Sequence, residues 1–137
     1  MGKRITLVLG SGTARGLAHI GVIRVLEEQG YEISAITGTS MGALIGGIYA
    51  AGKLDKYADW AESLTKKDVI KYLDISFRTK SGILKGDLII EALRDFVGDI
   101  SIESLPIPFL AVATDLTARK EAWISKGNLF EAIRASM

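Results

Sequence analysis

Hydrophobic positions along this chain form short continuous runs and longer stretches that repeat every three to four residues. Short runs rich in β-branched residues are typical of buried strands, whereas the longer repeat is typical of a helix with one buried side. Strands are therefore predicted over residues 4–9, 33–36, 109–114 and 121–125. Helices are predicted over residues 14–29, 40–51, 53–73 (interrupted near 65–67), 87–97 and 128–137, with a polar loop over 74–85.

The predicted strands and helices alternate along the sequence, which is typical of an α/β protein with a mainly parallel sheet. The fully apolar run at 109–114 suits a central parallel strand, because such a strand is buried on both faces. A length of 137 residues is enough for one domain with a sizeable core. Residues 1–137 are therefore expected to form a single α/β domain.

The pentapeptide at residues 38–42 carries the most chemical information, because it has the sequence Gly-x-Ser-x-Gly. An apolar strand precedes it and an uncharged helix follows it, which is the strand–turn–helix context of a nucleophile elbow. A serine in such a turn stands at a helix N-terminus, where amide groups and the helix dipole favour negative charge. Ser40 is the predicted nucleophile, and a plain turn without chemistry is the alternative. The remaining elbow residues are Gly38, Thr39, Met41 and Gly42.

A glycine-bearing loop at residues 10–16 follows the first predicted strand. Its spacing is Gly-x-Gly-x-x-x-Gly, but no acidic residue ends the second strand and no Gly-Lys-Ser/Thr follows, which weighs against dinucleotide and P-loop sites. The carboxyl ends of parallel strands share one crevice, so the loop should lie beside Ser40 and could bind an oxyanion there. A tight turn without a ligand is the alternative. The predicted amide donors are Gly10, Ser11, Gly12, Thr13, Ala14 and Arg15.

The base that would activate Ser40 is not evident in the sequence. His19 is the only histidine, and it precedes Ser40, whereas α/β-hydrolases place their catalytic histidine after the serine and the acid. We therefore interpret His19 as a structural or supporting residue. A serine hydrolase without a usable histidine needs another base, and a carboxylate is the natural replacement.

Composition narrows the range of functions further. A net charge of +1, without a lysine and arginine cluster, argues against nucleic-acid binding. The absence of cysteine excludes disulfides, thiolate metal sites and a cysteine nucleophile, and it fits a cytoplasmic protein. Residues 33–52 carry no charge, but their glycines and hydroxyl groups favour a buried strand and helix over a membrane span. No metal or cofactor is expected.

Four motifs in order along the chain carry a family resemblance. They are Leu9-Gly10-Ser11-Gly12-Thr13-Ala14-Arg15-Gly16 with His19-Ile20-Gly21-Val22, Gly38-Thr39-Ser40-Met41-Gly42, Ala113-Thr114-Asp115-Leu116, and Ala132-Ile133-Arg134-Ala135-Ser136-Met137. Together they resemble the bacterial patatin-like phospholipases. The resemblance implies a three-layer α/β/α fold and hydrolysis of lipid esters such as phospholipids or lysophospholipids, with peripheral contact to a membrane. It also implies a Ser-Asp dyad without histidine, in which Ser40 is the nucleophile and the amides of residues 10–15 form the oxyanion hole.

Two departures from the family pattern affect these expectations. Ser11 and Thr13 stand where the family has glycine, and the oxyanion hole persists if neither residue needs a positive φ. The family's catalytic aspartate lies in an Asp-Gly-Gly/Ala motif beyond the Arg-Ala-Ser segment, and residues 1–137 stop before it. The match thus covers roughly the N-terminal half of a family domain. Asp115 is the alternative acid, and its other role would be to orient a loop.

Two further classes of function stay open on the sequence. A non-catalytic lipid-binding or regulatory module would keep the fold without the chemistry, and a nucleotide-dependent oxidoreductase would use the glycine loop differently. Because general acid–base catalysis contributes about 10²–10⁴-fold to a rate, a chain without its base should be nearly inert. Residues 1–137 alone are therefore expected to show little hydrolysis.

Overall fold

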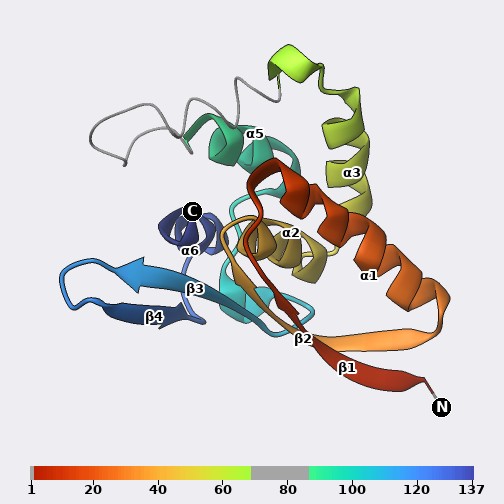
Figure 1. Ribbon diagram of the computed structural model, residues 1–137, viewed down its shortest axis with the longest axis horizontal. Coiled ribbons are helices and arrows are strands. Elements are labelled where there is room, and N and C mark those ends of the chain that lie inside the picture. The colour runs from red at the N-terminus through yellow and green to blue at the C-terminus, as the bar shows by residue number, and fades with distance from the viewer. Residues whose placement is uncertain (1, 69–86) are drawn as a thin grey trace.

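The computed structural model describes residues 2–68 and 87–137, and its elements follow the predicted alternation of strands and helices (Figure 1). The strands are β1 (Lys3–Leu9), β2 (Tyr31–Thr39), β3 (Phe109–Asp115) and β4 (Lys120–Ile124). The helices are α1 (Ala18–Glu28), α2 (Met41–Ala50), α3 (Leu54–Ser63), α5 (Asp87–Val97) and α6 (Leu129–Ser136), with short 3-10 helices η1 (Thr13–Leu17) and η3 (Ile102–Ser104). The loop predicted over 74–85 and the last part, 69–73, of the helix predicted over 53–73 lie outside the described residues.

The sheet has the strand order β1-β2-β3-β4, with β1, β2 and β3 parallel and β4 antiparallel to β3. Both parallel connections step to the next strand in the same direction, so right-handed crossovers place their helices on the same face of the sheet. The helices accordingly lie together on one side of the sheet (Figure 1). The prediction of an α/β fold with a mainly parallel sheet is confirmed.

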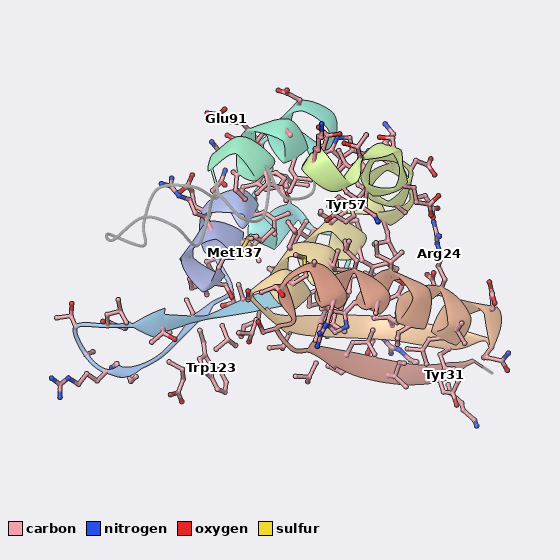
Figure 2. The ribbon with its side chains drawn as sticks, turned by 45° about the horizontal axis from the view of Figure 1, so that its top comes forward. Arg24, Tyr31, Tyr57, Glu91, Trp123 and Met137 are labelled. Atoms are coloured by element: carbon pink, nitrogen blue, oxygen red, sulfur yellow. The ribbon has the colours of Figure 1, made fainter. Side chains whose placement is uncertain are left out.

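Helices cover one face of the sheet, whereas side chains on the other face are exposed. One face and the helices share a single core, whose fully buried side chains include Ile36 of β2, Leu44 of α2 and Phe130 of α6. On the other face Val8 is 79% exposed and Trp123 is 69% exposed, and Figure 2 shows Trp123 on the side away from the helices. The three-layer arrangement implied by the resemblance needs helices on both faces, and the described residues supply the layer on one of them.

The uncharged stretch at residues 33–52 is divided between β2 and α2, as predicted. Every residue of α2 except Tyr49 is buried, which explains why the helix carries no charge. Burial and the hydrogen bond to Glu27 raise the pKa of Tyr49, so its hydroxyl stays protonated and donates to the Glu27 carboxylate at 2.7 Å. This bond ties the end of α2 to α1. Among the described helices, none combines the length and the apolar character needed to cross a bilayer.

Strand β2 is longer than the predicted strand because a bulge interrupts its alternation. Ile33 and Ala35 face the consecutive β1 residues Ile5 and Thr6, so Ser34 is an extra residue in the ladder. The Ser34 hydroxyl donates to the Ile5 carbonyl at 2.9 Å. The bulge shifts the buried positions by one residue. The hydrophobic residues of β2 therefore do not alternate regularly along the sequence, and the pattern predicts only part of the strand.

The interruption predicted near 65–67 is real but lies slightly earlier. Helix α3 ends at Ser63, and Leu64 is extended, with ψ of 133°. The Thr65 amide then donates to the Asp68 carboxylate at 2.9 Å, and the Asp68 amide donates to the Thr65 hydroxyl at 3.2 Å. This reciprocal cap starts a new helical turn, so the break precedes it.

Helix α6 is held firmly at its start. The Asn128 side chain accepts hydrogen bonds from the amides of Phe130 and Glu131, at 3.0 and 3.1 Å, as an N-cap. Arg94 of α5 donates to the Glu131 carboxylate at 2.7 Å. These contacts hold the start of α6 in place beside α5. The last residues of α6 lie near Ser40.

Candidate active site

The carboxyl ends of the three parallel strands meet at one edge of the sheet. Within the ladder Leu9 pairs with Gly38, and Thr39 pairs with Val112. The loop after β1, the turn after β2 and the end of β3 at Asp115 therefore lie along the same edge. This edge is where open α/β sheets bind their ligands.

Ser40 forms a sharp turn between β2 and α2. Strand β2 ends at Thr39, Ser40 has φ of 54° and ψ of −119°, and α2 begins at Met41. A backbone conformation of this kind costs a residue other than glycine about 1–3 kcal/mol. The Ser40 carbonyl accepts the first helical hydrogen bond, from the Leu44 amide at 3.0 Å. The arrangement is the strand–turn–helix expected for the pentapeptide.

The two glycines of the pentapeptide are required by close backbone contacts. A Cβ atom at Gly38 would lie 2.3 Å from the Gly42 carbonyl oxygen, and one at Gly42 would lie 2.1 Å from the Leu9 carbonyl oxygen. Backbone atoms at such distances cannot move aside without shifting an element. The turn therefore packs directly against the end of β1, which brings the loop at 10–16 beside it.

The loop at 10–16 contains two residues in the left-handed half of backbone space. Gly12 has φ of 153°, and Thr13 has φ of 47°. The condition stated for Ser11 and Thr13, that neither needs a positive φ, is met at Ser11 and not at Thr13, which adopts this conformation as threonine. The Thr13 hydroxyl donates to the Gly12 carbonyl at 2.7 Å, and this bond helps to offset the strain.

The backbone amides of residues 11–15 fall into two groups. The Arg15 amide donates to the Gly12 carbonyl at 3.0 Å and is therefore engaged in the turn that opens η1. The amides of residues 11–14 donate no hydrogen bond within the described part of the chain. Unpaired amides in a turn before a helix are suited to an anion.

His19 and Gly16 support the loop from its helical side. His19 Nε2 lies 2.9 Å from the Gly10 carbonyl oxygen, so the imidazole contacts the loop backbone. A Cβ atom at Gly16 would lie 2.3 Å from the Met41 side chain, so η1 packs tightly on the residue after Ser40. Both contacts fix the loop relative to the turn.

Asp115 is engaged in the hairpin between β3 and β4. Its Oδ1 atom accepts hydrogen bonds from the amides of Thr117 and Ala118, at 2.9 and 2.8 Å. This is an Asx-type turn, in which a carboxylate orders the following residues. Between Asp115 and Ser40 the structure has no hydrogen bond, and Ser40 Oγ donates none within the described residues.

Ser136 is a site residue that the sequence analysis did not single out. Its hydroxyl accepts a hydrogen bond from the Ser40 amide at 2.8 Å and donates one to the Val112 carbonyl. In the sequence, residues 134–136 stood out only as the Arg-Ala-Ser part of a family motif. No spacing between motifs indicated that residue 136 would contact residue 40. The contact depends on how α6 packs against the sheet.

A hollow of about 570 Å³ adjoins this end of α6. It contains the exposed apolar side chains Leu116, at 83% exposure, and Met137, at 44%. Arg134 also lines it and lies 4.0 Å from Glu131. The surface beside Ser136 is therefore mixed, with apolar groups next to a guanidinium. Among the described residues no cluster of histidine, aspartate and glutamate could hold a metal ion.

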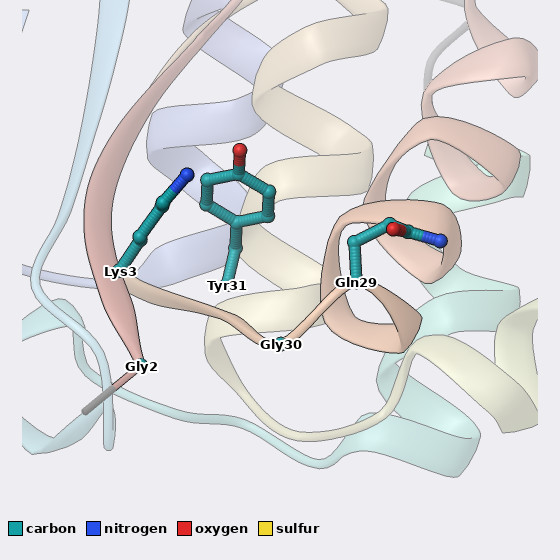
Figure 3. Close-up of a pocket in the computed structure, with 5 residues that line it drawn as sticks. All are labelled: Gly2, Lys3, Gln29, Gly30 and Tyr31. Carbon is teal, nitrogen blue, oxygen red and sulfur yellow. The ribbon is translucent and has the colours of Figure 1, made fainter.

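A second hollow lies at the opposite end of the strands. It is lined by Gly2, Lys3, Gln29, Gly30 and Tyr31 (Figure 3). Lys3 Nζ lies 5.6 Å from the centre of the Tyr31 ring, a cation–π distance. This hollow is at the beginning of β1 and β2, whereas Ser40 follows the end of β2, so it is not part of the candidate site.

Comparison of the sequence with known proteins identifies the family of this chain. The sequence profile of the patatin-like phospholipase family matches residues 7–137. An uncharacterized NTE family protein of Mycobacterium tuberculosis is 54% identical over 134 residues, which are 98% of this chain and 37% of the relative. The neuropathy target esterase of Drosophila melanogaster is 34% identical over 141 residues, 99% of this chain and 10% of that protein. The chain thus spans well under half the length of these relatives, and it belongs to the patatin-like phospholipase family.

Proposed function

We propose that this chain supplies the nucleophile and the oxyanion hole of a serine acyl-ester hydrolase. The observation that carries the proposal is the left-handed backbone of Ser40, at φ 54°, between a strand and the N-terminus of a buried helix. This backbone presents the hydroxyl outside the ladder, next to the positive end of the α2 dipole. The neighbouring loop offers the amides of residues 11–14, which have no acceptor among the residues that the structure describes.

In the proposed reaction Ser40 Oγ attacks the carbonyl carbon of an ester and gives its proton to a base. The carbonyl oxygen becomes an oxyanion, which the amides of residues 11–14 stabilise. The bond to the leaving alcohol then breaks, the alcohol takes the proton, and water later releases the acyl group from Ser40. Removing one oxyanion donor typically costs about 3 kcal/mol of transition-state stabilisation, so the loop is a large part of the chemistry.

The base of the proposed Ser-Asp dyad is a carboxylate that lies beyond Met137 in the whole protein. Three observations support this. His19 is hydrogen-bonded to the Gly10 carbonyl, and Asp115 orders the β3–β4 hairpin through its carboxylate. The mycobacterial relatives are longer than this chain, which covers 37% of their length. A further Asp-Gly segment therefore has room in a protein of that size.

The substrate that the proposal assigns is a lipid ester, such as a phospholipid or a lysophospholipid, and no cofactor takes part. The hollow beside Ser136 offers the apolar side chains Leu116 and Met137, together with Arg134. Apolar groups favour an acyl chain, and a guanidinium suits a phosphate. Exposed Leu116 in the hairpin also suits peripheral contact with a membrane. The Drosophila relative is named an esterase, which agrees with this class.

The roles of Ser40 and His19 can be separated in the full-length encoded protein. Ser40→Ala is expected to lower the turnover of p-nitrophenyl esters by about 10³-fold or more, because the nucleophile is removed. His19→Gln is expected to retain turnover within about threefold, because glutamine can still contact the Gly10 carbonyl and His19 is not the base. The measurement is kcat for both variants, with folding checked by circular dichroism.

An equal collapse of kcat in both variants, with the fold intact, would favour a Ser-His mechanism instead. Retention of turnover in Ser40→Ala would remove the nucleophile from the proposal and leave the lipid-binding module as the better account.

A further inference from the structure

The Ser136 hydroxyl occupies a specific place in the hydrogen-bond ladder between β2 and β3. The Ile36 amide donates directly to the Pro108 carbonyl at 2.9 Å. In a parallel pair the same strand donates at every second residue, so Ile36, Gly38 and Ser40 are the successive donors. The register places the acceptor for the Ser40 amide at Val112.

At Ser40 the backbone has already left the strand, so its amide does not donate directly to the Val112 carbonyl. The Ser136 hydroxyl lies between the two groups instead. Ser136 Oγ accepts the hydrogen bond from the Ser40 amide at 2.8 Å and donates its own to the Val112 carbonyl. One hydroxyl from α6 therefore completes the ladder at the residue where the backbone leaves the strand. Helix α6 lies against this part of the sheet (Figure 1).

We propose that Ser136 is a positioning residue, which holds the Ser40 backbone in its left-handed conformation during catalysis. This inference rests on the proposed role of Ser40 as nucleophile. A hydroxyl is suited to the task because it donates and accepts at once, and both the Ser40 amide and the Val112 carbonyl need a partner. Alanine at 136 would leave both groups unsatisfied or bridged by water.

Helix α6 is anchored to the rest of the fold, which restricts the movement of Ser136 relative to Ser40. The Asn128 cap and the Arg94–Glu131 ion pair fix the start of the helix, and Ser136 lies at its end. The nucleophile is thus tied to a helix that comes from the far end of the described sequence. A further consequence concerns the oxyanion hole: the Ser40 amide already donates to Ser136, so it is not one of the proposed donors.

The test compares Ser136→Ala, Ser136→Thr and Ser104→Ala in the full-length encoded protein. Ser104 is the matched control, because its hydroxyl donates to the Ser101 carbonyl at 2.8 Å in an exposed turn far along the chain from Ser40. A misplacement of a reacting atom by about 1 Å can cost about 10²-fold in rate. We expect Ser136→Ala to lower kcat about tenfold or more with KM within about twofold, because only the geometry of the nucleophile changes.

The conservative variant separates positioning from general stability. Ser136→Thr keeps the hydroxyl and should restore kcat to within about threefold of the wild type, and Ser104→Ala should leave kcat and KM unchanged. A folded Ser136→Ala variant with kcat within about twofold of the wild type would overturn the positioning role. So would a Ser136→Thr variant that is as slow as Ser136→Ala.

A second measurement needs no variant that could fail to fold. In the wild-type protein the Ser40 amide should exchange with solvent slowly, at a rate like that of the β2 ladder, because Ser136 accepts its hydrogen bond. Exchange as fast as that of an exposed turn would overturn the inference. Turnover that survives Ser40→Ala would instead overturn the proposed function, which keeps the two failures distinct.

Discussion

Extending the chain from residues 1–137 through the expected Asp-Gly motif of the whole protein should raise kcat for short p-nitrophenyl esters by about 10²-fold or more. The reason is that residues 1–137 hold the proposed nucleophile Ser40 and the proposed oxyanion hole, whereas Ser40 Oγ has no hydrogen-bonded base among the described residues. The measurement compares steady-state turnover of the two lengths at equal concentration, with Ser40→Ala as the background of each.

Two results would contradict this expectation in different ways. Robust turnover by residues 1–137, lost on Asp115→Asn with the fold intact, would make Asp115 the base despite its bonds to Thr117 and Ala118. Turnover near the Ser40→Ala background in both lengths would favour the non-catalytic lipid-binding module. Circular dichroism of the shorter chain establishes whether the comparison is between folded proteins.

Gly42→Ala and Gly21→Ala are expected to change stability in opposite directions. A Cβ atom at Gly42 would lie 2.1 Å from the Leu9 carbonyl oxygen and 2.5 Å from the Gly10 carbonyl oxygen, so α2 or the end of β1 must shift. We expect a loss of about 2 kcal/mol or more in the free energy of unfolding. At Gly21, in α1, a Cβ atom would meet no atom within 4 Å, and alanine should gain about 0.5–1 kcal/mol through helix propensity.

Urea unfolding followed by circular dichroism gives both values. The pair controls for the substitution itself, because both glycines lie in helices and both receive the same methyl group. A Gly42→Ala variant as stable as the wild type would show that the elbow and β1 are not packed as closely as described. Destabilisation of similar size at Gly21 would show that the method reports a general effect of replacing glycine.

The sequence predicted the fold well wherever local pattern and tertiary structure agree. The runs that became β1 and β3 are rich in apolar residues, and glycine marks the end of α1 at Gly30, where φ is 77°. It predicted β2 less completely, because the bulge at Ser34 breaks the period on which such a prediction depends. It predicted the break after α3 slightly too late, because the Thr65–Asp68 cap is a local bond that the hydrophobic period does not register.

The candidate site was predictable where it is contiguous in sequence and not where it is assembled by packing. The Gly-x-Ser-x-Gly segment encodes its own turn, since each glycine is demanded by a neighbour that lies a few residues away or at the end of the adjacent strand. The positive φ of Thr13 was not predictable, because threonine rarely adopts it. The bond between Ser136 and Ser40 spans 96 residues and exists only after α6 docks on the sheet.

The central claim is that Ser40 is the reactive nucleophile of this family member, and covalent labelling tests it most directly. The full-length protein is treated with a fluorophosphonate, digested, and searched by mass spectrometry for the modified peptide. The account predicts a single adduct on Ser40, and none in the Ser40→Ala variant under the same conditions. An adduct on a different serine, or a folded wild-type protein that stays unlabelled at Ser40, would contradict it.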